Sequence, residues 1–145
     1  MRSTPQLSEE TDRVQELLKE IKTIAIVGIS RNRHKDSRYV GSYLKRAGYK
    51  IIPVNPNADT ILGETSYPDL ESIPENVDAV DVFLPEEWMP EIIEQSIPLE
   101  PRAIWLQLGT GKHPEKAGFA KNKNLMIVQN RCMKVDHQFL VRDKQ

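Results

Sequence analysis

An α/β fold with a doubly wound parallel sheet is predicted by the order in which two kinds of segment follow one another. Short apolar segments rich in β-branched residues, such as residues 23–27 and 51–54, alternate with segments of helical periodicity, such as residues 40–47. The 145 residues, of which 39% are hydrophobic, can bury one core but are too few for two ordinary domains. We therefore expect one domain over residues 1–145, with its strands in the order 3-2-1-4-5-6.

The first half of the chain contains the best-defined unit. Residues 23–27 form an apolar strand that ends at Gly28, and Gly48 stops the following helix before the second strand at 51–54. A right-handed crossover brings the carboxyl end of the first strand and the amino end of the helix to one edge. A leading helix within residues 1–21 is expected to pack on the domain, because its apolar residues form one stripe, namely Val14, Leu17, Leu18 and Ile21.

The alternation of strand and helix continues through the second half. The expected elements are a short edge strand at 65–67, a helical turn at 69–73, a buried strand at 79–84 interrupted by Asp81, a helix at 86–97, a strand at 103–106, a short helix at 114–121 and a last strand at 125–128. Trp88 and Trp105 lie in apolar patterns, so both are expected in the core. In the predicted strand order, the turns after the first, fourth and fifth strands meet at one rim.

The turn after the first strand departs from the pattern of NAD-binding proteins. That pattern requires glycines at positions 28, 30 and 33, where this chain has Gly28, Ser30 and Arg33. An acidic residue that would bind the ribose 2′-hydroxyl of NAD is also missing after the second strand, where Asn55 and Pro56 stand. The sequence therefore disfavours NAD.

A basic loop takes the place of the missing glycines. It carries Arg31, Arg33, His34, Lys35 and Arg38, and Asp36 or Ser37 can cap the helix that follows. Cations at a strand-to-helix junction are typical of a site for a ligand with several phosphates. Solvated charges on an exposed turn are the alternative interpretation.

A series of motifs in this chain resembles a known family. The series is AIVGIS, SRYVGSYLKRAGYKIIPVNPN, ILGETSYPDLESIP, VDAVDVFLP, AIWLQLG and NRCMKV, in this order over nearly the whole chain. It is similar to the small single-domain CoA-binding proteins and to the CoA-binding domain of the succinyl-CoA synthetase alpha subunit. The resemblance implies a Rossmann-like fold that binds coenzyme A, and it implies a ligand more firmly than a reaction.

The resemblance also implies which residues lie near the ligand. These are Gly28, Ile29, Ser30 and Ser37 at the diphosphate, Val54, Asn55 and Pro56 at the adenosine end, and Phe83, Pro85 and the turn from Gln107 to Gly109 along the pantetheine arm. Arg31, Arg33 and Arg38 would reinforce the phosphate contacts, with no assignment of each to one phosphate. Gly109 and Gly111 have an alternative explanation that involves no ligand, namely a loop whose backbone needs positive φ at these positions.

Composition restricts the class of partner. The net charge of −1 gives the chain no overall field for nucleic acid or an anionic membrane, so we expect a small-molecule ligand. The longest apolar runs have the length of strands, and the amino terminus lacks a signal-peptide core, so we expect a cytoplasmic protein. The three histidines have no ligand-like spacing, which predicts no metal site.

Cys132 is the single thiol of the chain. Arg131 and Lys134 flank it, and their charges are expected to lower the thiol pKa and favour a nucleophilic thiolate. A small buried hydrophobe is the more common role of such a cysteine. A redox or thiol-exchange role, including a mixed disulfide with CoA, is the less favoured interpretation.

The sequence thus predicts a non-catalytic binding or regulatory module for CoA or an acyl-CoA, since it offers neither an acid–base constellation nor an activating domain. Two alternatives stay open. One is an NADP-dependent oxidoreductase or an acyl-CoA-handling enzyme completed by a partner subunit. The other is a regulatory protein whose CoA-loaded state another protein recognises through the leading helix. A homodimer is compatible with each.

Overall fold

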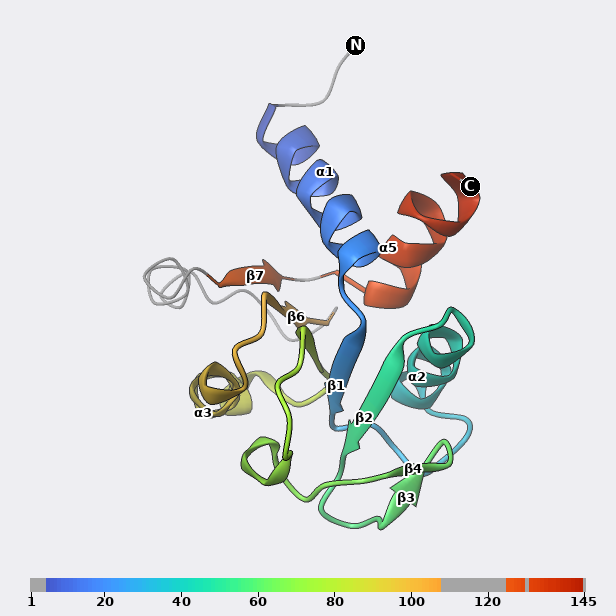
Figure 1. Ribbon diagram of the computed structural model, residues 1–145, viewed down its shortest axis with the longest axis vertical. Helices are drawn as coiled ribbons and strands as arrows, with labels where there is room; N and C mark the ends of the chain where they lie inside the picture. Colours follow the sequence, from blue (N-terminus) through green and yellow to red (C-terminus); the bar gives the residue numbers. More distant parts are fainter. Residues whose placement is uncertain (1–4, 108–124, 130, 145) are drawn as a thin grey trace.

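A central parallel sheet organises the structure, which is a computed structural model that describes residues 5–107, 125–129 and 131–144 (Figure 1). Its strands are β1 (Thr23–Val27), β2 (Lys50–Val54), β5 (Ala79–Val82), β6 (Ala103–Leu106) and β7 (Met126–Gln129). They lie in the order β2-β1-β5-β6-β7, and every neighbouring pair is parallel. The α/β fold class predicted from the sequence is therefore confirmed.

Helices cover both faces of this sheet. The α-helices are α1 (Pro5–Glu20), α2 (Asp36–Arg46), α3 (Met89–Ser96) and α5 (Met133–Leu140), and the 3₁₀ segments are η1 (Leu70–Ser72), η2 (Glu86–Trp88), η3 (Ile97–Leu99) and η4 (Arg142–Lys144). Figure 1 shows α2 and α3 on opposite sides of the strands. One core cluster joins the sheet to α1, α2 and α5, and a second joins it to η1 and α3.

The two cores follow from the alternation of side chains along each strand. On β1, Ile24 and Ile26 belong to the first cluster, whereas Ala25 and Val27 belong to the second. Because helices cover both faces, the strands are apolar at nearly every position, as is typical of parallel sheets. The predicted stripe of the leading helix lies in the first cluster, with Val14 fully buried.

The predicted edge strand at 65–67 is not part of the main sheet. Instead, β3 (Thr60–Ile61) and β4 (Glu64–Thr65) form a separate antiparallel pair. Tyr67 makes only an isolated parallel bridge with Val54. The main sheet therefore lacks the first member of the predicted order 3-2-1-4-5-6, while the remaining strands follow it.

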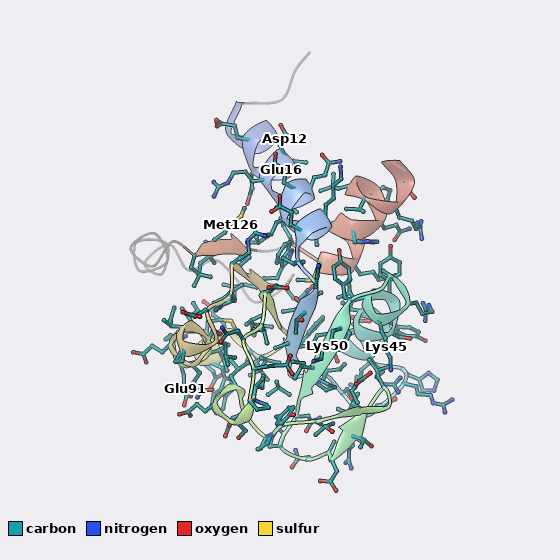
Figure 2. The ribbon with its side chains drawn as sticks, viewed as in Figure 1. Asp12, Glu16, Lys45, Lys50, Glu91 and Met126 are labelled. Atoms are coloured by element: carbon teal, nitrogen blue, oxygen red, sulfur yellow. The ribbon has the colours of Figure 1, made fainter. Side chains whose placement is uncertain are left out.

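Two side chains anchor this β3–β4 pair to the rest of the structure. Lys45 of α2 lies 3.1 Å from the Glu64 carboxylate and also donates to the carbonyl of Leu62 (Figure 2). The hydroxyl of Ser66 donates to the carbonyl of Asn55 over 3.3 Å. The pair thus lies beside the end of β2 at the carboxyl edge of the sheet.

Three further expectations can be compared with the structure. Trp105 is fully buried as expected, but Trp88 is 47% exposed, so the prediction that it lies in the core is wrong. The helix α5 was not predicted, and it packs against α1, where Gln15 Nε2 donates to the carbonyl of Leu140 over 2.7 Å. The helix expected at 114–121 lies outside the described residues. Within the described part of the chain, no helix combines the length and apolar character needed to cross a membrane.

Candidate functional site

The turns that follow β1, β2 and β5 meet at the carboxyl edge of the sheet. The amide of Gly28 donates to the carbonyl of Val54 over 3.1 Å, and Asn55 Nδ2 donates to the carbonyl of Ile29 over 2.9 Å. On the other side, the amide of Phe83 donates to the carbonyl of Val27 over 2.8 Å. The carboxyl ends of the first and fourth predicted strands therefore lie side by side as predicted, whereas most of the turn after the fifth predicted strand lies outside the described residues.

Gly28 is the residue that allows this close approach. Its φ is +84°, a conformation that residues with a Cβ rarely adopt. A Cβ built at this position would lie 3.0 Å from the carbonyl oxygen of Phe83 and from Leu84 Cδ2. Glycine is thus required both by the backbone and by the neighbouring turn.

A chain of side-chain hydrogen bonds fixes the loop from residue 30 to residue 37. Ser37 Oγ accepts from the amide of Ser30 over 2.9 Å, and Ser30 Oγ accepts from the amide of Asn32 over 2.9 Å. Asn32 Oδ1 in turn accepts from the amide of His34 over 2.9 Å. The Ser30 amide, expected at the diphosphate, therefore already has a partner within the loop.

Other donors of this turn lack a partner. Among the described residues, nothing accepts a hydrogen bond from the amides of Ile29, Arg31, Arg33 and Ser37. Lys35 is the N-cap of α2, and no side chain caps the helix. Open amides and the helix dipole make this end attractive to an anion, although Asp36 places one negative charge in the first turn.

The basic side chains divide into an exposed group and one half-buried residue. Arg31, Arg33 and Lys35 are exposed, and no carboxylate of the described residues pairs with them. Arg38, in the first turn of α2, is half-buried, and its buried Nε has no hydrogen-bond partner. A buried guanidinium nitrogen normally has an acceptor, so Arg38 indicates where an anion would be favourable.

The residues expected at the adenosine end have different degrees of exposure. Val54 is 3% exposed and serves the second core, while Asn55 holds the turn through its bond to Ile29 and accepts from the amide of Asn57 over 2.7 Å. Pro56 is exposed. Of these three residues, Pro56 is the one whose side chain offers a free apolar surface.

The residues expected along the pantetheine arm lie on the other side of Gly28. Phe83 is half-buried against the first core, and Pro85 is exposed. Gln107 is buried, and its Nε2 donates to Asp81 Oδ1. Gly109, with Thr110 and Gly111, lies outside the described residues.

Comparison with known proteins identifies the family. The sequence profile of the CoA binding domain matches residues 22–138, which is most of the chain. This protein belongs to the CoA-binding domain family. The resemblance seen in the motifs is thereby confirmed, and the family includes the CoA-binding domains of ADP-forming acetyl-CoA synthetases, which are related to the succinyl-CoA synthetase alpha subunit.

Two relatives and one solved structure illustrate the range of this CoA-binding domain. The uncharacterized protein YneT of Bacillus subtilis is 33% identical over 124 residues, which is 86% of this chain and 91% of YneT. The ADP-forming acetate–CoA ligase II of Archaeoglobus fulgidus is 38% identical over 76 residues, 51% of this chain but 11% of the ligase. The structure of a hypothetical protein from Pyrococcus horikoshii OT3 matches 97% of this chain and 99% of its own with 32% identity and a TM-score of 0.86.

A buried polar cluster in this CoA-binding domain was not assigned to the site from the sequence. Asp81 on β5 is fully buried, and Asp136 on α5 is 8% exposed. Asp136 accepts from Trp105 Nε1 over 3.2 Å and forms an ion pair with Arg131 at 2.8 Å. The only sequence signal was the interruption of an apolar strand by Asp81, because its partners come from elements far along the chain.

Cys132, at the N-cap of α5, belongs to the same region. Burial raises the pKa of the Cys132 thiol, and the charges of Asp81 and Asp136 add to that effect, although the amides of Val135 and Lys134 lower it. The direction is therefore opposite to the one expected from the sequence, chiefly because the thiol is partly buried, and Arg131 is paired with Asp136. The structure therefore gives Cys132 the character of a protonated thiol.

The two described histidines lie apart from any arrangement typical of metal binding. His34 is exposed on the basic loop, and His137 Nδ1 lies 2.9 Å from the hydroxyl of Tyr43. His113 lies outside the described residues. Within the part of the chain that the structure describes, no three histidine, cysteine or acidic residues gather in a way that could hold a metal ion.

Proposed function

We propose that this protein binds coenzyme A or an acyl-CoA at the carboxyl edge of its sheet and acts as a non-catalytic binding or regulatory module. The match to the CoA binding domain over residues 22–138 is the observation that carries this proposal. The diphosphate would lie at the turn after Gly28, the adenosine beside Pro56, and the pantetheine arm across Phe83 and Pro85. We assign no reaction to the chain.

The phosphate end of the ligand is supported by unmet donors. The amides of Arg31, Arg33 and Ser37 and the buried Nε of Arg38 have no acceptor among the described residues. The oxygens of a diphosphate would satisfy Arg38 and the amino end of α2 together. The exposed Arg31 and Arg33 would then be available to the 3′-phosphate of CoA.

A thermal-shift titration tests the ligand class. CoA and acetyl-CoA should raise the melting temperature more than ATP or NADP at equal concentration. A ligand at a hundredfold excess over its Kd adds roughly 2.7 kcal/mol to the free energy of unfolding. Stabilisation by NADP without stabilisation by CoA would replace the proposal with the oxidoreductase alternative.

Variants of the basic loop test the phosphate assignment. Arg31→Ala and Arg33→Ala should each weaken CoA binding about tenfold by calorimetry, since a lost charge-assisted contact is worth about 1.5 kcal/mol. If the arginine contacts the 3′-phosphate, each substitution should weaken the binding of dephospho-CoA less than the binding of CoA. Arg46→Ala is the matched control, because this exposed arginine lies at the opposite end of α2 and bonds Ser42. Equal losses for both ligands would assign the arginines to the diphosphate.

A second function is favoured by the similarity to the acetate–CoA ligase of Archaeoglobus fulgidus. The chain spans 11% of that ligase, so an acyl-CoA-handling enzyme would need its other parts from a partner subunit. Affinity purification from the native host, followed by a ligase assay, tests this alternative. A single-component eluate that binds CoA but forms no acyl-CoA would favour the binding module.

A further inference from the structure

Asp81 occupies an unusual place in the sheet. It lies one residue before the end of the central strand β5, in register with Ile26 of β1 and Trp105 of β6. Its side chain is fully buried on the face that packs against α1, α2 and α5, which is also the face of Phe83. A carboxyl group thus lies in a mostly apolar layer that also holds Gln107 and Asp136, directly below the rim.

Among the described residues, one of its two oxygens has a partner and the other has none. Gln107 Nε2 donates to Oδ1, whereas the buried Oδ2 has no hydrogen-bond partner among the described residues. Burial raises the pKa of Asp81 to about 7, with the Asp136 charge adding to this rise and the Gln107 hydrogen bond opposing it. Because Oδ1 already accepts a hydrogen bond, the proton of the neutral acid belongs on Oδ2. Oδ2–H is then a donor that lacks an acceptor.

Among the described residues, the charge that acts on Asp81 is that of Asp136 on α5, and Asp136 is paired with Arg131. The Asp81 charge in turn raises the pKa of the Cys132 thiol at the start of that helix. From the neighbouring strands, β1 contributes the apolar Ile26 and β6 contributes the uncharged Trp105 and Gln107. No described cation contacts Asp81, so a phosphate would be repelled there, whereas a neutral carbonyl oxygen would be an acceptable partner.

We propose that Asp81 is a specificity-determining residue whose Oδ2–H group donates a hydrogen bond to a carbonyl oxygen in the pantetheine or acyl part of a bound CoA compound. This inference rests on the proposed function. CoA carries its phosphates at one end and neutral carbonyl groups along the other arm, and the basic loop and Asp81 likewise present cations and a neutral donor at two different places. Gln107 follows β6 at the rim, and its hydrogen bond positions the Asp81 carboxyl group.

The sign of the pH dependence follows from this role. A ligand that binds the protonated acid loses affinity as the pH rises through about 7. From pH 6 to pH 8.5 the protonated fraction falls roughly thirtyfold, and the apparent affinity follows that fraction. Because the ligand phosphates also titrate, affinity for acetyl-CoA is compared with affinity for ADP that carries a 3′-phosphate and a methyl ester on its β-phosphate. This fragment lacks the pantetheine arm, and the ester leaves it with the same titrating phosphate as acetyl-CoA.

Calorimetry on the full chain tests the proposal with three variants. For wild type, the ratio of acetyl-CoA affinity to fragment affinity should fall at least tenfold from pH 6 to pH 8.5. Asp81→Asn keeps a donor in the place of Oδ2, so this ratio should stay nearly constant with pH. Asp81→Leu removes the donor and should lower the ratio about tenfold at pH 6. Asp78→Asn, at the opposite edge beside the same strand, should behave as wild type.

The possible outcomes separate this inference from the function on which it rests. If wild type binds both ligands and Asp81→Asn retains the wild-type pH profile of the ratio, or weakens both ligands equally, the inference is overturned and the function survives. Asp81 would then have a structural role, such as holding a buried water. If wild type binds neither ligand, both are overturned. Should Asp81→Leu fail to fold, the Asp81→Asn profile decides alone.

Discussion

The basic loop and the buried acid lie at the same edge of the sheet but are built in opposite ways. The loop consists of exposed cations and main-chain amides that follow one another in sequence. The acid cluster joins Asp81, Gln107 and Asp136, which come from distant parts of the chain and are nearly inaccessible to solvent. Changes in the loop should therefore alter binding with little effect on stability, whereas changes around the acid should alter both.

The largest expected effect is on the buried side. Trp105 is fully buried and donates to Asp136, so Trp105→Ala should lower the free energy of unfolding by about 3–5 kcal/mol through the cavity and the lost bond. Chemical denaturation measures this change. Trp88→Ala is the control, because the exposed Trp88 should change stability by less than about 0.5 kcal/mol. Similar losses in the free energy of unfolding for the two variants would contradict the burial of Trp105 and the exposure of Trp88.

Gly28→Ala should affect both regions, because this glycine links the loop to the turn after β5. Positive φ alone disfavours alanine by about 1–2 kcal/mol, and the contact with Phe83 adds to it. Gly48→Ala isolates the backbone effect, since Gly48 has φ +109° and open space around its position. Thermal unfolding should show a larger loss for Gly28→Ala, and equal losses would rule out the close contact.

The pH dependence of the free energy of unfolding is expected to report on the buried Asp81 rather than on the exposed basic loop. Because the folded-state pKa of Asp81 is raised from 3.8 to about 7, the folded protein holds this proton more tightly than the unfolded chain. Its contribution to stability is present below about pH 4 and is lost as the pH rises to about 7. Urea unfolding at pH 5 and pH 8 should thus show a difference between wild type and Asp81→Asn that depends on pH. A difference that stays constant from pH 5 to pH 8 would mean that the folded-state pKa of Asp81 is not raised above about 5.

The smallest expected effect belongs to the basic loop. Arg31→Ala and Arg33→Ala should leave the free energy of unfolding within about 0.5 kcal/mol of wild type, because both side chains are exposed and unpaired among the described residues. The same thermal measurement without ligand checks this. A clear loss of stability would mean that these arginines have a structural role.

The local signals in the sequence explain which elements could be predicted. Strands β1, β2, β5, β6 and β7 are mostly apolar segments, and α2 has helical periodicity with a glycine after its end, so each is specified by neighbouring residues. The edge strand failed as a prediction because pairing at Tyr67 depends on the position of β2, and β4 pairs instead with β3. Helix α5 was missed because two of its buried positions are the polar Asp136 and His137, which obscure its apolar stripe.

The same distinction applies to the candidate site. The turn at Gly28 and the cations after it could be recognised because they are consecutive in the sequence. The pairing of Asp81 with Gln107 depends on the register between β5 and β6, which no local pattern specifies. The expected direction of the Cys132 pKa was wrong for a related reason, since the burial of the thiol and the pairing of Arg131 with Asp136 are set by the fold and not by neighbouring residues.

The hydrogen-bond chain from Ser37 through Ser30 and Asn32 to His34 has a kinetic consequence. A loop that is ordered before it meets an anion loses little further conformational entropy on association. The rate of encounter should then be governed by diffusion and electrostatic attraction rather than by loop rearrangement. The association rate of CoA measured by stopped flow should accordingly fall as ionic strength increases, because the basic loop is a positively charged binding surface on a nearly neutral molecule.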